Sequence, residues 1–91
     1  MYLWVVSYDI TDDKRRNKLA KLLLSYGERV QYSVFECRLK DISELAGKVS
    51  RLIDQEQDSV RIYRICDICR EKIKLQGQAP DYSADEHFLI I

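Results

Sequence analysis

The feature that most constrains this sequence is a near-continuous apolar and aromatic run at residues 2–8, followed directly by a polar turn. A run of this kind is typical of a strand in the middle of a sheet that is covered on both faces. The chain has 91 residues, and a domain this short buries only roughly 60% of the surface that it exposes when unfolded. We therefore expect a single domain, residues 1–91, that is built around residues 2–8 and stabilised by association.

Apolar spacing and turn residues predict the remaining elements. The first helix begins where Thr11 or Asp12 can cap it, runs to about Tyr26 and stops at Gly27, which can adopt a left-handed backbone conformation. Its apolar stripe consists of Leu19, Leu22, Leu23 and Tyr26. The other expected elements are a strand at 29–39, a helix at 41–57, a strand at 59–65, a short strand at 73–77 and, after Pro80, a terminal strand at 87–91.

Two arrangements of these elements give the order βαββαβ. Either residues 29–39 bend into a hairpin, or they form one strand that pairs with 60–65 while 73–77 supplies the fourth strand. Both predict an α+β, ferredoxin-like βαββαβ sandwich with the two helices on one face of the sheet. Residues 87–91 would be an additional C-terminal strand, and an exposed apolar edge of that kind is best covered by pairing. We expect it to join the sheet of a second copy, so that the protein is homodimeric.

The charges of the chain sum to zero, which argues against a purely electrostatic nucleic-acid binder. Their distribution is uneven, since residues 1–40 carry eight Lys and Arg against five Asp and Glu, and the rest of the chain carries seven against ten. No apolar run reaches the ~20 residues of a membrane span, and the N-terminus lacks the signals of a secretion peptide. We therefore expect a cytoplasmic protein without membrane contact, with a basic patch in its first half.

Asp9 is the first candidate for chemistry, because it stands where the first strand ends. Mg²⁺ often takes only one or two protein carboxylates and fills its other positions with water and phosphate. A two-fold axis near Asp9 would supply the second carboxylate and create a site for Mg²⁺ or Mn²⁺. Such a metal would polarise a phosphodiester and activate a water molecule. The alternative is a simple helix-entry aspartate at a turn.

Five basic residues fall within eight positions of the first helix. The helical repeat places them on the side opposite the apolar stripe, where they either contact phosphates or form a solvated helix face. These residues are Lys14, Arg15, Arg16, Lys18 and Lys21. Arg29 and Arg38 would extend the patch.

The chain has three cysteines, Cys37, Cys66 and Cys69, and this odd number argues against a disulfide framework. The spacing of Cys66 and Cys69 is that of a zinc or redox motif, but a structural zinc site needs four ligands, and only Cys37 and His87 are available to complete it. We interpret Cys66 and Cys69 as a buried, inert pair or a helical turn. His87 falls within the predicted terminal strand and is expected to pack there.

Several stretches together resemble the CRISPR-associated protein 2 family. They are Tyr8-Asp9-Ile10, Asp13-Lys14-Arg15-Arg16, Tyr26-Gly27, Arg29-Val30-Gln31-Tyr32-Ser33-Val34-Phe35-Glu36-Cys37 and Ile65-Cys66-Asp67-Ile68-Cys69. The spacing from the strand-end aspartate to the Arg-Val-Gln-x-Ser-Val-Phe-Glu run is specific, and the similarity covers essentially the whole chain.

The resemblance implies a ferredoxin-like homodimer whose terminal strands complete the neighbour's sheet. It also implies a role in spacer acquisition, in which the dimer bridges two dimers of the CRISPR-associated protein 1 integrase and holds a DNA protospacer. Some members are metal-dependent endonucleases on RNA or DNA. In these, the residue that corresponds to Asp9 is metal-binding and catalytic, and the positions of Tyr8, Arg16, Arg29 and Phe35 support the site or the nucleic acid.

Three functions remain open from the sequence. The first is an adaptation subunit that binds DNA and the integrase, with secondary or absent nuclease activity. The second is a Mg²⁺-dependent endoribonuclease that cleaves single-stranded RNA, including the toxin-like proteins of the virulence-associated D type. The third is a plain dimeric scaffold, which the basic residues of the first helix make the weakest of the three.

Overall fold

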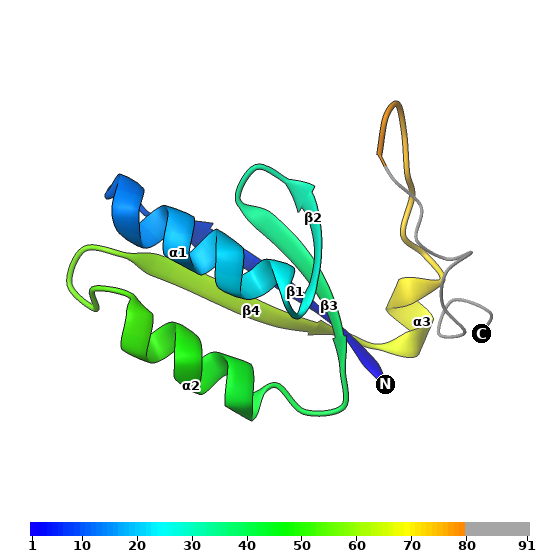
Figure 1. The fold of residues 1–91 in the computed structure, drawn as a ribbon. Helices are drawn as coiled ribbons and strands as arrows, with labels where there is room; N and C mark the ends of the chain where they lie inside the picture. Colours follow the sequence, from blue (N-terminus) through cyan, green and yellow to red (C-terminus); the bar gives the residue numbers. More distant parts are fainter. Residues whose placement is uncertain (80–91) are drawn as a thin grey trace.

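The computed structural model describes residues 1–79 and contains a four-stranded sheet with its two longer helices on one face (Figure 1). The strand order is β2-β3-β1-β4, and every neighbouring pair is antiparallel. The elements are β1 (Tyr2–Asp9), α1 (Asp13–Leu24), β2 (Gly27–Gln31), β3 (Val34–Leu39), α2 (Ser43–Leu52), β4 (Ser59–Ile65) and α3 (Asp67–Arg70). This is the predicted ferredoxin-like α+β sandwich, in which each helix connects two strands that have a third strand between them.

The hairpin version of the prediction is correct. Residues 29–39 break at Tyr32 and Ser33 into β2 and β3, and β2 carries an irregularity between Arg29 and Gln31. The short strand predicted at 73–77 is wrong, because these residues form no strand and the hairpin of β2 and β3 already supplies the fourth strand. The described chain leaves the sheet after β4 and continues beyond α3 as an exposed, irregular segment (Figure 1).

Gly27 has a different role from the predicted one. It does not end α1 in a left-handed conformation, since Gly77 is the only glycine with positive φ among residues 1–79. Instead, Gly27 begins β2, and an added Cβ would lie 2.2 Å from the carbonyl oxygen of Glu36 on β3. Helix α1 ends earlier, at Leu24, and is capped by Ser25, whose backbone N–H and hydroxyl both donate to the carbonyl of Leu22. The glycine therefore permits close pairing of two strands.

The second helix is shorter than the predicted 41–57. It ends at Leu52, because the next residues form a turn that aspartates close. The backbone N–H of Glu56 donates to the Asp54 carboxylate at 2.9 Å, and the N–H of Asp54 donates to the Asp58 carboxylate at 2.8 Å. Aspartate side chains that accept local backbone hydrogen bonds favour turns over helix.

The core lies between the sheet and the two longer helices. Val6 and Phe35 from the sheet and Leu19, Leu23 and Leu45 from the helices are fully buried. The predicted stripe on α1 is confirmed, with Leu22 and Tyr26 packed at its margin. Burial of side chains of this size stabilises the fold by about 1.5–3 kcal/mol each.

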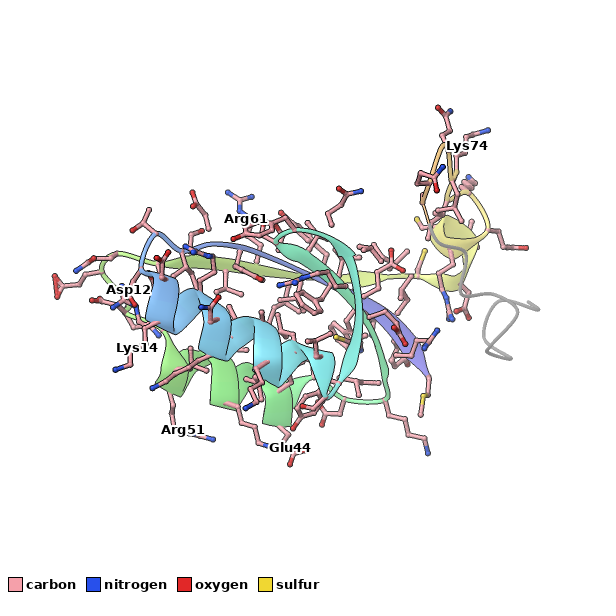
Figure 2. The ribbon with its side chains drawn as sticks, turned by 45° about the horizontal axis from the view of Figure 1, so that its top comes forward. Asp12, Lys14, Glu44, Arg51, Arg61 and Lys74 are labelled. Atoms are coloured by element: carbon pink, nitrogen blue, oxygen red, sulfur yellow. The ribbon has the colours of Figure 1, made fainter. Side chains whose placement is uncertain are left out.

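The opposite face of the sheet is covered by neither α1 nor α2. The period of two along β1 places Leu3, Val5, Ser7 and Asp9 on this open face. Figure 2 shows Arg61 of β4 pointing to this side, whereas Glu44 and Arg51 of α2 point the opposite way. We expected both faces of β1 to be covered, but the two longer helices cover only one of them. Leu3 is nonetheless buried, outside the helix-side cluster.

Pro80, His87 and the strand predicted at 87–91 lie outside the described residues. None of the helices within residues 1–79 has the length and apolar character needed to span a bilayer.

Candidate metal and nucleic-acid site

Asp9 is the last residue of β1, is exposed, and pairs in the sheet with Ser59 at the start of β4. Within residues 1–79, its carboxylate takes part in no hydrogen bond or ion pair. In the same part of the chain, no three His, Cys, Asp or Glu side chains gather closely enough to hold a metal ion. One copy of this site therefore offers a single rigidly placed carboxylate with both oxygens free.

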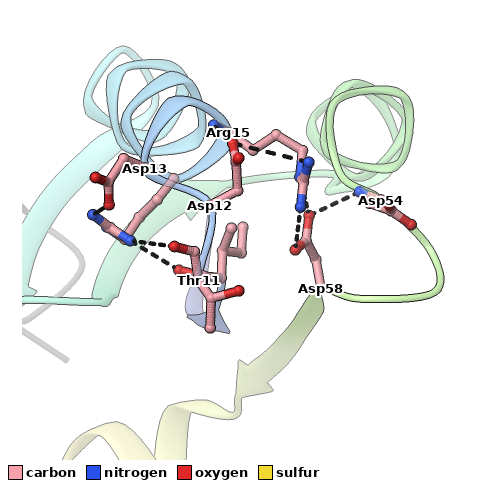
Figure 3. Close-up of polar contacts among 8 residues, drawn as sticks. Thr11, Asp12, Asp13, Arg15, Asp54 and Asp58 are labelled. Atoms are coloured by element: carbon pink, nitrogen blue, oxygen red, sulfur yellow. Dashed lines mark hydrogen bonds and ion pairs between the residues drawn. The ribbon is translucent and has the colours of Figure 1, made fainter.

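Arg16 fixes the loop that follows Asp9. Its guanidinium donates to the carbonyl oxygens of Ile10 at 3.1 Å and Thr11 at 3.3 Å, and also to the Asp13 carboxylate (Figure 3). Ile10 is itself buried in the core. The chain directly after Asp9 is therefore held from both sides, by apolar packing and by a cation. The role of Arg16 at the site or toward the nucleic acid stays a prediction.

Tyr8 and Phe35 form the buried base under this end of β1. Their rings stack with centroids 6.3 Å apart, and the Tyr8 hydroxyl donates to the carbonyl of Tyr32 at 3.5 Å. Tyr8 is 5% exposed and Phe35 is not exposed at all. Both side chains can therefore support the site through packing, but neither presents a surface to a ligand.

Arg29 and Tyr32 lie at the surface above that base. The guanidinium of Arg29 lies 5.1 Å from the ring centre of Phe35 and 5.8 Å from that of Tyr32, within the range of cation–π contacts. The pKa of Arg16 is raised, first by its hydrogen bond to Asp13 and then by the Tyr32 phenol. Tyr32 is 70% exposed. The sequence had not marked it as a site residue, although an aromatic residue in a hairpin turn is a usable signal.

The basic patch predicted on α1 divides into two groups. Lys14, Lys18 and Lys21 are exposed, and none has an acidic partner within the described residues. Figure 2 shows Lys14 pointing away from the body of the protein. These three lysines are the free cations of the helix.

Arg15 belongs to the second group, because it faces the turn before β4. Its Nε donates to Asp58 Oδ2 at 2.8 Å and its Nη2 to Oδ1 at 3.3 Å (Figure 3). The Asp58 side chain has no exposed surface. The pKa of Asp58 is lowered, first by the hydrogen bond from Arg15 and next by the backbone N–H of Asp54. The sequence had not marked Asp58, which lies 43 positions from its partner.

The two cysteines of the C-x-x-C motif lie at the other end of the sheet. Both are exposed, so the interpretation as a buried pair is wrong, whereas the helical turn is confirmed by α3. Cys37 is buried in the helix-side core. His87, the other candidate zinc ligand, lies outside the described residues.

Comparison with known proteins gives consistent matches over most of the chain. The family model for CRISPR associated protein Cas2 matches residues 1–73. The CRISPR-associated endoribonuclease Cas2 1 of Chloroflexus aurantiacus is 47% identical over 91 residues, which cover 97% of this chain and 98% of that protein.

Solved structures agree with the sequence match. A hypothetical protein from Thermus thermophilus is 47% identical, with a TM-score of 0.78 over 87% of this chain and 94% of that one. A chain of a partial Cas6-RT-Cas1–Cas2 complex is 32% identical, with a TM-score of 0.71 over 87% and 93% of the two chains. The match spans the strand that ends at Asp9, the basic helix and the hairpin. The chain therefore belongs to the Cas2 family of CRISPR-associated proteins.

Proposed function

We propose that this protein is the Cas2 subunit of a spacer-acquisition complex, which binds nucleic acid as a homodimer, bridges Cas1 integrase dimers and carries a metal-dependent endonuclease site at Asp9. The observation that carries the proposal is the free carboxylate of Asp9 at the rigid end of β1. The similarity to a chain of a complex that contains Cas1 and Cas2 favours the adaptation role over that of a toxin-like endoribonuclease.

The open face of the sheet supports the homodimer. It carries apolar side chains from three strands, among them Val5, Val34 and Ile65. Asp9 projects from β1 on the same face. A symmetric pairing of two open faces would therefore cover apolar surface and bring the two copies of Asp9 toward one groove. Glu36 also lies on this face, and burial raises the pKa of its carboxyl.

The residues present fit a hard cation such as Mg²⁺ or Mn²⁺. An exposed carboxylate without an internal partner is the donor that such an ion prefers, and two carboxylates with water and phosphate complete an octahedral site. When bound, the ion supplies Lewis-acid polarisation of a phosphodiester and a more acidic water. The protein's own contribution is Asp9 as the ligand, Tyr8 and Phe35 as its packed support, and Arg16 as the clamp of the following loop.

The nucleic acid would lie along the exposed cations near that groove. Lys14, Lys18 and Arg29 are available for phosphate contacts, and Tyr32 offers an exposed ring on which a base can stack. Arg15 and Arg16 remain predictions as nucleic-acid contacts, and their present partners favour structural roles.

The test compares Asp9→Asn with Glu56→Gln, a matched change of an exposed carboxylate on the turn after α2. Purified proteins are titrated with Mg²⁺ in the presence of single-stranded RNA or duplex DNA, and Cas1 binding is followed separately. We expect Asp9→Asn to lower cleavage by at least ~100-fold and to leave Cas1 binding unchanged, while Glu56→Gln behaves as wild type. Equal cleavage by both variants would contradict the metal site at Asp9. If wild type does not bind Cas1, the adaptation role is contradicted.

A further inference from the structure

Cys66, which caps the start of α3, and Cys69, within α3, are two exposed thiols three positions apart. The sulfur of Cys66 accepts a hydrogen bond from the backbone N–H of Cys69 at 3.4 Å. One helical turn therefore holds the sulfur of Cys66 at the backbone of Cys69, and both thiols are accessible in a place that the proposed nuclease site does not use.

The two thiols are not equivalent. The pKa of the Cys66 thiol is lowered, first by the hydrogen bond from the backbone N–H of Cys69. The pKa of the Cys69 thiol is raised, first by the neighbouring Cys66 side chain. Since the thiolate is the reactive form, Cys66 is the nucleophile of the pair and Cys69 the neighbouring thiol that can resolve an adduct. Burial raises the pKa of Cys37 to about 11, so this third thiol is an internal control.

We propose that Cys66 and Cys69 are a redox-active dithiol that a low-molecular-weight disulfide such as glutathione disulfide oxidises to an intrachain disulfide. The Cys66 thiolate attacks one sulfur of glutathione disulfide and forms a mixed disulfide, and one glutathione thiolate leaves. The Cys69 sulfur, after loss of its proton, then attacks the Cys66 sulfur and releases the second glutathione. The protein loses two protons and two electrons, which together equal two hydrogen atoms, and the glutathione disulfide is reduced to two glutathione molecules.

The position of the pair indicates what its oxidation can affect. Arg70 of α3 is 4% exposed, and its guanidinium donates to the Met1 carbonyl at 3.4 Å and to Asp67 at 3.1 Å. These contacts join α3 to the start of β1, whereas Asp9 stands at its far end. Closing the disulfide bonds the sulfur that accepts from the Cys69 N–H to the Cys69 sulfur and so acts on the turn that leads into the exposed segment 71–79. The two sites are thus separate, and the redox state should leave the Asp9 region unchanged.

The full-length protein is incubated with glutathione disulfide near neutral pH in the presence of a metal chelator. Its mass is then measured before and after alkylation with iodoacetamide. We expect wild type and Cys37→Ser to lose the mass of two hydrogen atoms and to protect Cys66 and Cys69 from alkylation. We expect Cys69→Ser to stop at a glutathione adduct on Cys66. In the reduced protein, Cys66 should alkylate at least ~10-fold faster than Cys69.

Two results would overturn the proposal. One is equal alkylation rates at Cys66 and Cys69 together with stable glutathione adducts on both. The other is a disulfide that joins two chains in place of the intrachain product. Because no readout depends on nucleic acid, metal or Cas1, failure here is distinguishable from failure of the proposed function. Circular dichroism of Cys66→Ser and Cys69→Ser checks that both variants fold. If either is unstable, the loss of two hydrogen atoms by Cys37→Ser still tests the proposal, because this variant retains only Cys66 and Cys69.

Discussion

Asp9 and Asp58 lie one strand apart at the same end of the sheet, yet their surroundings are opposite. Asp9 ends β1 and pairs with Ser59, the residue directly after Asp58. The Asp9 carboxylate is exposed and has no partner within residues 1–79. The Asp58 side chain has no exposed surface and accepts from Arg15 and from the backbone of Asp54.

The difference separates structural charges from available ones. A bidentate arginine–carboxylate pair satisfies its own donors and acceptors and joins α1 to the turn before β4. A carboxylate that is rigidly placed but unpaired has no such internal role, and its charge is available to a ligand. The same distinction divides the basic residues of α1, since Arg15 is paired while Lys14 and Lys18 are free.

The largest expected effect on stability follows from breaking the Asp58 contacts. Asp58→Asn removes the charge that Arg15 faces and weakens the closure of the turn at Asp54. Loss of one partner of a buried pair leaves the other uncompensated, and we expect Tm to fall by about 5–10 °C. Asp9→Asn should leave Tm unchanged, because no described contact is lost. Thermal unfolding of both variants measures the difference, and equal shifts would contradict the division into structural and available carboxylates.

A smaller effect is expected from the cations of α1. The double change Lys14→Gln and Lys18→Gln should lower affinity for duplex DNA by about 10-fold at low salt and reduce the slope of log K against log salt by about 2. Arg15→Gln should leave that slope unchanged and lower Tm, because Arg15 is committed to Asp58. Fluorescence anisotropy across a salt series checks both variants. If Arg15→Gln alone flattens the slope, Arg15 exchanges its internal partner for phosphate.

Much of this fold could be predicted from local pattern. The run at residues 2–8 identified the central strand and placed Asp9 at its end, although that strand was expected to be covered on both faces. The apolar stripe of α1 was correct because amphipathic spacing directly reports the buried side. These features depend on neighbours in sequence, which is why the sequence alone was sufficient.

The features that were missed depend on contacts between distant residues. Gly27 is required by a carbonyl on β3 and not by the end of a helix. Arg15 was grouped with phosphate-binding cations because its partner lies 43 positions away. The exposure of Cys66 and Cys69 depends on where the chain leaves the sheet after β4. Local spacing contains none of this information.

The smallest expected effect is a change in stability with pH, which is absent at neutral pH and develops only in acid. It is also the sharpest test of the comparison between Asp9 and Asp58. The pKa of Asp58 is lowered in the folded protein from its ordinary value of 3.8, first by the hydrogen bond from Arg15. A carboxyl with a lowered folded pKa stabilises the fold fully above its unfolded pKa, and this contribution is lost as the pH falls through the lower folded value. The Tm difference between wild type and Asp58→Asn should therefore be constant above pH 3.8 and shrink below it. Asp9→Asn should follow wild type throughout, and a difference for Asp58→Asn that persists in acid would show that packing, and not charge, maintains the Arg15 contact.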